Sequence, residues 1–147
     1  ERISVSRVEE HIRRLCPALA HVTVFGDQRK FLVALMTLKA KRNPLTGGFS
    51  DDLVGDALDV NPDVLTVTTA RRDEKWLKYI AGVIAQCNSN AATPSQKVKR
   101  FCILPTDYTV GTGELTPSEK VKRNAVQVKY AALIEKLYAE DSTPRKQ

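Results

Sequence analysis

The segment FLVALMTL at residues 31–38 is apolar at every position except Thr37, and it limits the possible folds more than any other feature. A strand with one face in water alternates apolar and polar residues, and this segment does not alternate. It is also shorter than a typical buried helix. We therefore expect a strand whose two faces are both covered by other parts of the chain.

Further strands and helices are indicated around this segment. His21–Phe25 reads as a second strand, joined to the first through a hairpin at residues 26–30 that contains Gly and Asp. A third strand is expected over residues 98–104, where Pro105 stops it. Apolar residues at helical spacing predict covering helices over residues 5–15, with Ser6 and Glu9 as a capping box, and over residues 69–88. These elements predict an α+β fold in which helices cover a small, mainly three-stranded sheet.

The remaining segments are less regular. A short helix is expected from Asp51 to just before Asn61-Pro62, and a polar loop covers residues 106–117. A last helix follows, for which Thr116–Glu119 and Asn124–Gln127 offer competing start signals. Lys120 therefore lies either in the first helical turn or in an exposed loop. The end of the chain, residues 141–147, is expected to be a disordered tail.

Length and composition favour a single compact unit over residues 1–140, because 147 residues with 42% hydrophobic content support one core. We expect no transmembrane segment and no signal peptide, since no apolar run is long enough. Cys16, Cys87 and Cys102 stand among apolar residues, which indicates reduced thiols and an intracellular, cytosol-facing location. His11 and His21 lack a second ligand at helical spacing, so no metal site is expected.

Charge is distributed unevenly along this chain of net charge +6, with basic ends and an acidic middle. Such a field attracts the phosphates of a nucleic acid, a nucleotide or a coenzyme, although a solvated charged face is an equal alternative. A basic nucleic-acid-binding module would use the cluster of Lys97, Lys99 and Arg100. We do not expect a nucleic-acid partner, because the few aromatic residues, several of them on apolar helix faces, leave no evident stacking platform.

Two motifs resemble a known family. The stretch GTGELTPSEKVKRNAVQVKY at residues 111–130 closely resembles the C-terminal signature of AMP-forming long-chain fatty acyl-CoA synthetases in the adenylate-forming superfamily. FGDQRKFLVALMTLK at residues 25–39 resembles the paired strands of the same domain, and specifically its bubblegum branch. The likeness extends to Tyr138. It implies that residues 1–140 are a C-terminal mobile domain, whose partner is the N-terminal adenylate-forming domain of the same chain and whose hinge precedes Glu1.

The resemblance also implies a ligase chemistry. Such enzymes form an acyl-adenylate from a fatty acid and ATP, with Mg²⁺ expected to accompany ATP, and then transfer the acyl group to CoA. By the motif, Lys120 corresponds to the adenylation lysine, while Arg123 and Lys122 are candidates for cofactor binding. Arg123 has the alternative role of bracing the final helix. The small domain alone is expected to bind none of these cosubstrates and to be inactive.

This sequence also departs from the family pattern. The broader superfamily has glycine directly before the catalytic lysine, where Glu119 stands here, so the loop geometry is open. Gly26 and Asp27 match the family and are assigned to the hairpin. Gly111 and Gly113 are loop glycines, because the Gly-Lys-Ser/Thr ending of a phosphate-binding loop is absent. A related enzyme that adenylates another carboxylic acid remains an alternative.

Overall fold

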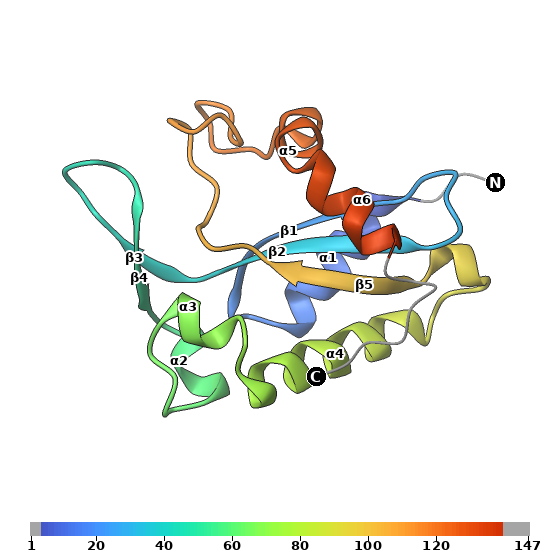
Figure 1. Cartoon of the computed structure of the whole chain (residues 1–147), viewed down its shortest axis with the longest axis horizontal. Helices are drawn as coiled ribbons and strands as arrows, with labels where there is room; N and C mark the ends of the chain where they lie inside the picture. The colour runs from blue at the N-terminus through green and yellow to red at the C-terminus, as the bar shows by residue number, and fades with distance from the viewer. Residues whose placement is uncertain (1–3, 140–147) are drawn as a thin grey trace.

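A three-stranded sheet forms the centre of the computed structural model, which describes residues 4–139 (Figure 1). Strand β2 (Leu32–Leu38) lies between β1 (Leu19–Phe25), which is antiparallel to it, and β5 (Val98–Ile103), which is parallel. Every residue of β2 is buried. The strand predicted from the apolar segment is thus confirmed, with both faces covered.

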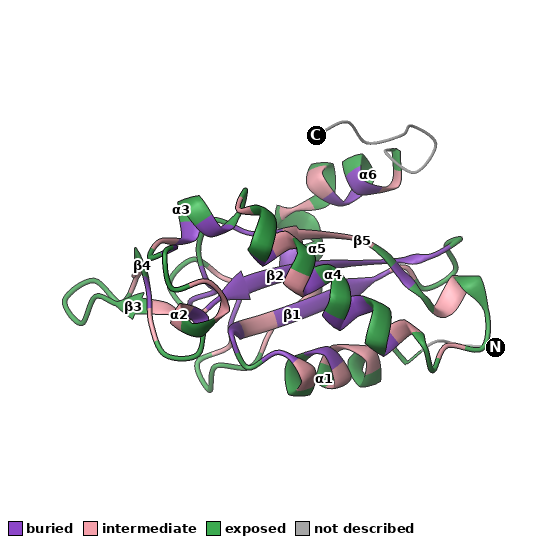
Figure 2. Cartoon of the chain, turned by 90° about the horizontal axis from the view of Figure 1, so that it is seen from below, coloured by how far each residue is buried: buried purple, intermediate pink, exposed green. Residues whose placement is uncertain are grey.

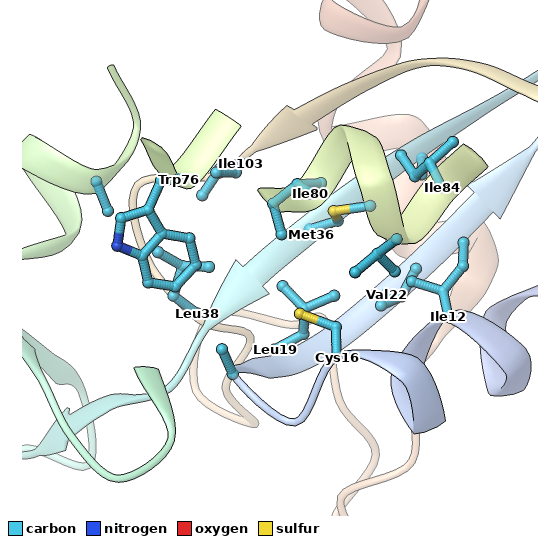
Figure 3. Packing of buried hydrophobic residues seen from close by; sticks show 14 of the residues in the cluster. Ile12, Cys16, Leu19, Val22, Met36, Leu38, Trp76, Ile80, Ile84 and Ile103 are labelled. Atoms are coloured by element: carbon cyan, nitrogen blue, oxygen red, sulfur yellow. The ribbon is translucent and has the colours of Figure 1, made fainter. Parts of the chain in front are cut away.

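The two faces of the sheet are covered by different helices (Figure 2). Helices α1 (Val5–Leu15) and α4 (Glu74–Asn88) cover one face, and α5 (Arg123–Lys129) and α6 (Ala131–Ala139) cover the other. Side chains of β2 alternate between the two cores because successive residues of a strand point to opposite faces. The larger core, shown in Figure 3, receives Leu32, Ala34, Met36 and Leu38, and the smaller core receives Val33 and Leu35.

The helix predicted from about Thr69 is divided into two in the structure. A short helix, α3 (Val67–Ala70), is capped by the Thr66 hydroxyl, which accepts from the Thr69 N–H at 3.2 Å. Helix α4 begins only at Glu74, where the Asp73 carboxylate accepts from the Trp76 N–H at 3.0 Å. The predicted apolar stripe is confirmed, but the predicted first residue of the helix was wrong, because aspartate, here Asp73, favours a cap over a helix interior.

The helix predicted from Asp51 is wrong for most of its length. Residues Phe49–Leu53 form strand β4, which pairs with β3 (Ala40–Arg42) in a second, two-stranded sheet that projects from the body (Figure 1). Only α2 (Ala57–Val60) is helical. Pairing with a distant strand outweighs the helix-start signal of the aspartates, as often happens when tertiary contacts compete with local propensity.

Neither capping box predicted from the sequence forms. Helix α1 begins after Ser4 without a side-chain cap, and Glu9 instead accepts from the Val24 N–H at 2.7 Å. Helix α5 begins at Arg123, also without a side-chain cap, and the last helix is divided into α5 and α6 at Tyr130. A single 3₁₀ turn, Pro94–Gln96, precedes β5. The predicted tail at residues 141–147 lies outside the described residues.

The three cysteines are free thiols, as predicted, with Cys16 and Cys87 buried and Cys102 partly buried. Burial raises the pKa of the Cys16 and Cys87 thiols. Over residues 4–139, no helix combines the length and apolar character needed to cross a bilayer.

Candidate functional site

Lys120 lies in an exposed turn, which settles the choice that the sequence left open. Leu115 and Val121 form an isolated antiparallel bridge, and the chain reverses between them. Thr116 closes the turn: its N–H donates to the Lys120 carbonyl at 2.8 Å, and its hydroxyl accepts from the Lys120 N–H at 3.0 Å. The backbone of the turn is therefore fixed while the Lys120 side chain faces solvent.

The residue before the lysine has an unusual backbone. Glu119 has a φ of 67°, in the left-handed region that L-residues rarely adopt. Its N–H donates to the Thr116 carbonyl at 2.7 Å, which holds this conformation within the turn. A glycine at this position, as in the broader superfamily, would adopt the same backbone without strain. Glu119 thus replaces the family's glycine but keeps the left-handed backbone conformation that glycine adopts most easily.

The cations predicted around the turn have different environments. Among residues 4–139, neither the Lys120 nor the Lys122 ammonium has an ion-pair or hydrogen-bond partner, and both residues are exposed. Arg123, in contrast, binds both carboxylate oxygens of Glu9 through its guanidinium, with Nη2 at 2.8 Å from Oε1, and donates to the Val24 carbonyl at 2.9 Å. These contacts favour the bracing role of Arg123, and its binding of a cofactor stays a prediction.

A buried carboxylate that the sequence reasoning missed lies at the base of the turn. The Glu114 side chain is 3% exposed and accepts from the Lys129 ammonium at 2.5 Å. It also accepts from the Thr109 N–H at 3.1 Å and from the Thr112 hydroxyl. Burial alone would raise the pKa of Glu114, but these hydrogen bonds outweigh it and lower the pKa. The hydrogen bond to Glu114 raises the pKa of Lys129 in turn.

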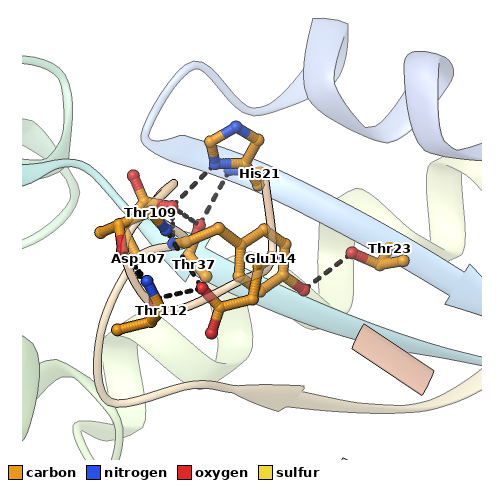
Figure 4. A network of polar contacts seen from close by, with 8 residues as sticks. His21, Thr23, Thr37, Asp107, Thr109, Thr112 and Glu114 are labelled. Carbon is orange, nitrogen blue, oxygen red and sulfur yellow. Dashed lines mark hydrogen bonds and ion pairs between the residues drawn. The ribbon is translucent and has the colours of Figure 1, made fainter. Parts of the chain in front are cut away.

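A second polar network holds the beginning of the same loop against the sheet (Figure 4). One Asp107 oxygen lies 2.7 Å from the His21 Nδ1 and accepts from the Thr37 hydroxyl and the Tyr108 N–H at the same distance. The Tyr108 hydroxyl lies 2.7 Å from that of Thr23, and burial raises the pKa of Tyr108. His21 is therefore a hydrogen-bonded structural residue. Over residues 4–139 no group of three or more metal-ligating side chains is present.

An open cavity of about 720 Å³ lies between the β3–β4 hairpin and residues 106–112. Arg42 and Lys129 contribute cations to its wall. The Arg42 guanidinium is 4.0 Å from the Glu119 carboxylate, so the projecting hairpin contacts the turn that carries Lys120. This contact was not predicted from the sequence, because the hairpin itself was not predicted.

The chain is similar in sequence to known proteins. A family model described as the AMP-binding enzyme C-terminal domain matches residues 64–142. The chain is 31% identical over 150 residues to the long-chain-fatty-acid–CoA ligase ACSBG2 of Gallus gallus, covering 98% of this chain and 20% of that protein. It is 32% identical over 164 residues to the long-chain-fatty-acid–CoA ligase heimdall of Drosophila melanogaster, covering 94% of this chain and 24% of that protein. The resemblance that the motifs predicted is confirmed, and the chain spans only about a fifth to a quarter of these relatives.

Solved structures with the same fold are adenylation domains. The adenylation domain of a carboxylate reductase from Mycobacterium chelonae has a TM-score of 0.63 at 21% identity, covering 93% of this chain and 18% of that one. The A domain of a carboxylic acid reductase from Segniliparus rugosus, in complex with AMP and a co-purified carboxylic acid, has a TM-score of 0.64 at 18% identity, covering 94% and 18%. At these identities the likeness shows the fold, and the predicted α+β class is confirmed.

Proposed function

The chain belongs to the family of AMP-binding enzyme C-terminal domains, and we propose that it is the C-terminal domain of a long-chain fatty acid–CoA ligase. In this proposal the complete enzyme joins a fatty acid to the α-phosphate of ATP with release of pyrophosphate. CoA then displaces AMP to give the thioester. The larger domain of the same chain holds the fatty acid, ATP and the Mg²⁺ that accompanies ATP. We place this enzyme in a cytosol-facing compartment, in keeping with its free thiols.

The Lys120 ammonium is the observation that carries the proposal. It is exposed at a turn whose backbone is fixed by Thr116, and it has no partner within residues 4–139. A cation that is to meet a phosphate on another domain has to be accessible and unpaired beforehand, because breaking an existing ion pair would cost part of the new interaction. The geometry of Lys120 meets both conditions.

The chemistry asked of Lys120 is electrostatic. When the fatty acid carboxylate attacks the α-phosphorus, negative charge accumulates on the phosphate oxygens between two anions. A positioned ammonium stabilises that transition state more than the separate reactants. Lysine suits the task because it is a compact charge on a long, flexible stem. A group of this kind lowers the activation free energy by on the order of 3 kcal/mol, which raises the rate about a hundredfold.

The test uses the full-length enzyme and separates its two half-reactions. We expect Lys120→Ala to lower acyl-adenylate formation by about a hundredfold or more. Thioester formation from supplied acyl-adenylate should change little, because the domain is proposed to rotate between two poses, one for each step, and to withdraw Lys120 from the phosphate in the second. Lys75→Ala is the control, since it removes an exposed lysine of α4, the helix that covers the opposite face of the sheet. The assay is run with fatty acids and with shorter carboxylic acids to identify the acid.

Two outcomes would count against this role of Lys120. Equal loss in both half-reactions would indicate that Lys120 supports the fold, and an unchanged rate of adenylation would refute the catalytic role.

A further inference from the structure

The turn that carries Lys120 is anchored at its base by one buried carboxylate. The Lys122 N–H donates to the Glu114 carbonyl at 2.7 Å, next to the bridge between Leu115 and Val121. We call these two paired segments, residues 114–115 and 121–122, the stem of the turn; the second segment continues directly into α5. The Glu114 side chain faces inward, where it binds the Lys129 ammonium on the last turn of that helix. A single residue thus connects the stem, by its backbone, with helix α5, by its side chain.

The same carboxylate also organises the loop that precedes the turn. The Thr109 N–H and the Thr112 hydroxyl donate to one of its oxygens, and Lys129 binds the other. The loop is closed further by the Leu115 N–H, which donates to the Thr109 carbonyl at 3.2 Å. Residues 109–122 belong to no named strand or helix, so these contacts supply much of the order that regular structure supplies elsewhere.

A carboxylate that is 3% exposed is costly to bury, and it is retained only where its partners are in place. Its four-residue network fixes the loop, the stem and α5 relative to one another. We propose that Glu114 is a positioning residue for Lys120, and that its ion pair with Lys129 sets the pose in which the Lys120 ammonium is presented. This inference rests on the catalytic role proposed for Lys120.

The consequence for catalysis follows from how sharply rates depend on position. Displacement of a catalytic group by about 1 Å can cost on the order of a hundredfold in rate. In the full-length enzyme, we expect Glu114→Gln to slow acyl-adenylate formation by about ten- to a hundredfold. The KM for ATP should change little, and thioester formation from supplied acyl-adenylate should be retained. Glu135→Gln is the control, because it neutralises an exposed carboxylate that pairs with Arg29 and belongs to α6.

A second readout does not depend on activity. Trypsin cleaves after Lys120, Lys122 and Arg123, and cleavage requires the turn to open locally. Loss of one charge-assisted hydrogen bond from Glu114 should raise the rate of cleavage at these residues by about tenfold, measured by mass spectrometry on the full-length protein. Tryptic sites in other parts of the chain should be cleaved at the wild-type rate.

Variants of Lys129 keep the test decisive if Glu114→Gln unfolds. The Lys129 side chain is 44% exposed, so its replacement leaves no cavity in the core. We expect Lys129→Met to show the faster cleavage and slower adenylation expected of Glu114→Gln. Lys129→Arg should keep both rates near those of the wild type, because arginine keeps a donor for the carboxylate. Cleavage at wild-type rate in Lys129→Met would overturn the positioning role whatever the activity. Faster cleavage with unchanged adenylation would also overturn it, and only the Lys120→Ala result would then decide the role of Lys120.

Discussion

Gly26 offers a test of the fold in which the structure predicts both the sign and the size of the effect. Its φ is 136°, a value that L-residues rarely adopt. A Cβ placed there would lie 2.6 Å from the Phe31 carbonyl oxygen and 2.7 Å from the Tyr138 hydroxyl. The backbone strain costs about 1–3 kcal/mol and the crowding a similar amount, so Gly26→Ala should lower the free energy of unfolding by about 4 kcal/mol.

The matched control is another glycine with the opposite expectation. Gly82 lies on the exposed side of α4, where an added Cβ would meet no atom within 4 Å. Because glycine weakens a helix interior, Gly82→Ala should raise the free energy of unfolding by about 0.5–1 kcal/mol. The same chemical change is therefore expected to act in opposite directions at the two positions.

Urea unfolding of the 147-residue chain measures both variants through the fluorescence of Trp76, its only tryptophan and a fully buried one. With a slope of about 2 kcal/mol per molar urea, Gly26→Ala should lower the midpoint by about 2 M. A Gly26→Ala midpoint within experimental error of the wild type would refute the reasoning, because it would mean that neither the strain nor the crowding exists.

Two further predictions concern the ion pairs beside the Lys120 turn. Glu114 has a lowered folded pKa and Lys129 a raised one, so the contribution of their pair should be present between their ordinary values of 4.5 and 10.5. This stabilisation should be lost as pH falls through the folded pKa of Glu114 or rises through that of Lys129. The difference in urea midpoint between the wild type and Glu114→Gln, followed against pH, measures the stabilisation. A difference that stays constant with pH would contradict the prediction. Arg123→Ala should lower the free energy of unfolding by about 2 kcal/mol, because it leaves Glu9 without its cation in a partly exposed pair. Arg123→Lys should recover only part of that loss, since lysine lacks the fork that binds both oxygens of Glu9, and full recovery would contradict the bidentate contact.

Sequence patterns predicted the elements whose signals are local. The apolar segment of β2 and the stripes of α1 and α4 depend only on the order of residues, and all three were found. The β3–β4 hairpin was missed because FSDDL contains two aspartates, which are rare in strands, and because its pairing is not visible in a single segment. Glu9 was assigned to a capping box for the same reason: its actual partners, Val24 and Arg123, are far away in the sequence.

The residues of the candidate site also differ in how far local sequence signals could predict them. Lys120 was predicted as a site residue because a motif marks it, and Thr116 closes the turn within the same motif. Glu114 stands in that motif too, but its role depends on burial and on Lys129, fifteen positions away. A glutamate in a polar loop is normally exposed, so nothing in the residue order distinguished this one. The one available sign was the pattern of Thr109, Thr112 and Glu114, whose short spacing suits a loop closed by side-chain hydrogen bonds.

The charges tied to the turn explain why Lys120 remains available. Three carboxylates are connected with this region, and each has another cation: Glu114 has Lys129, Glu9 has Arg123, and Glu119 has Arg42. Glu119 is exposed and directly precedes Lys120, so without Arg42 it would compete with an incoming phosphate for the Lys120 ammonium, whereas the Glu114 and Glu9 side chains are largely buried. Because each carboxylate is paired with another cation, the domain carries these acidic residues without neutralising the Lys120 ammonium that the proposed reaction uses. Loss of Arg42 would therefore release a competing anion beside Lys120, whereas loss of Lys129 would act on Lys120 by loosening the turn.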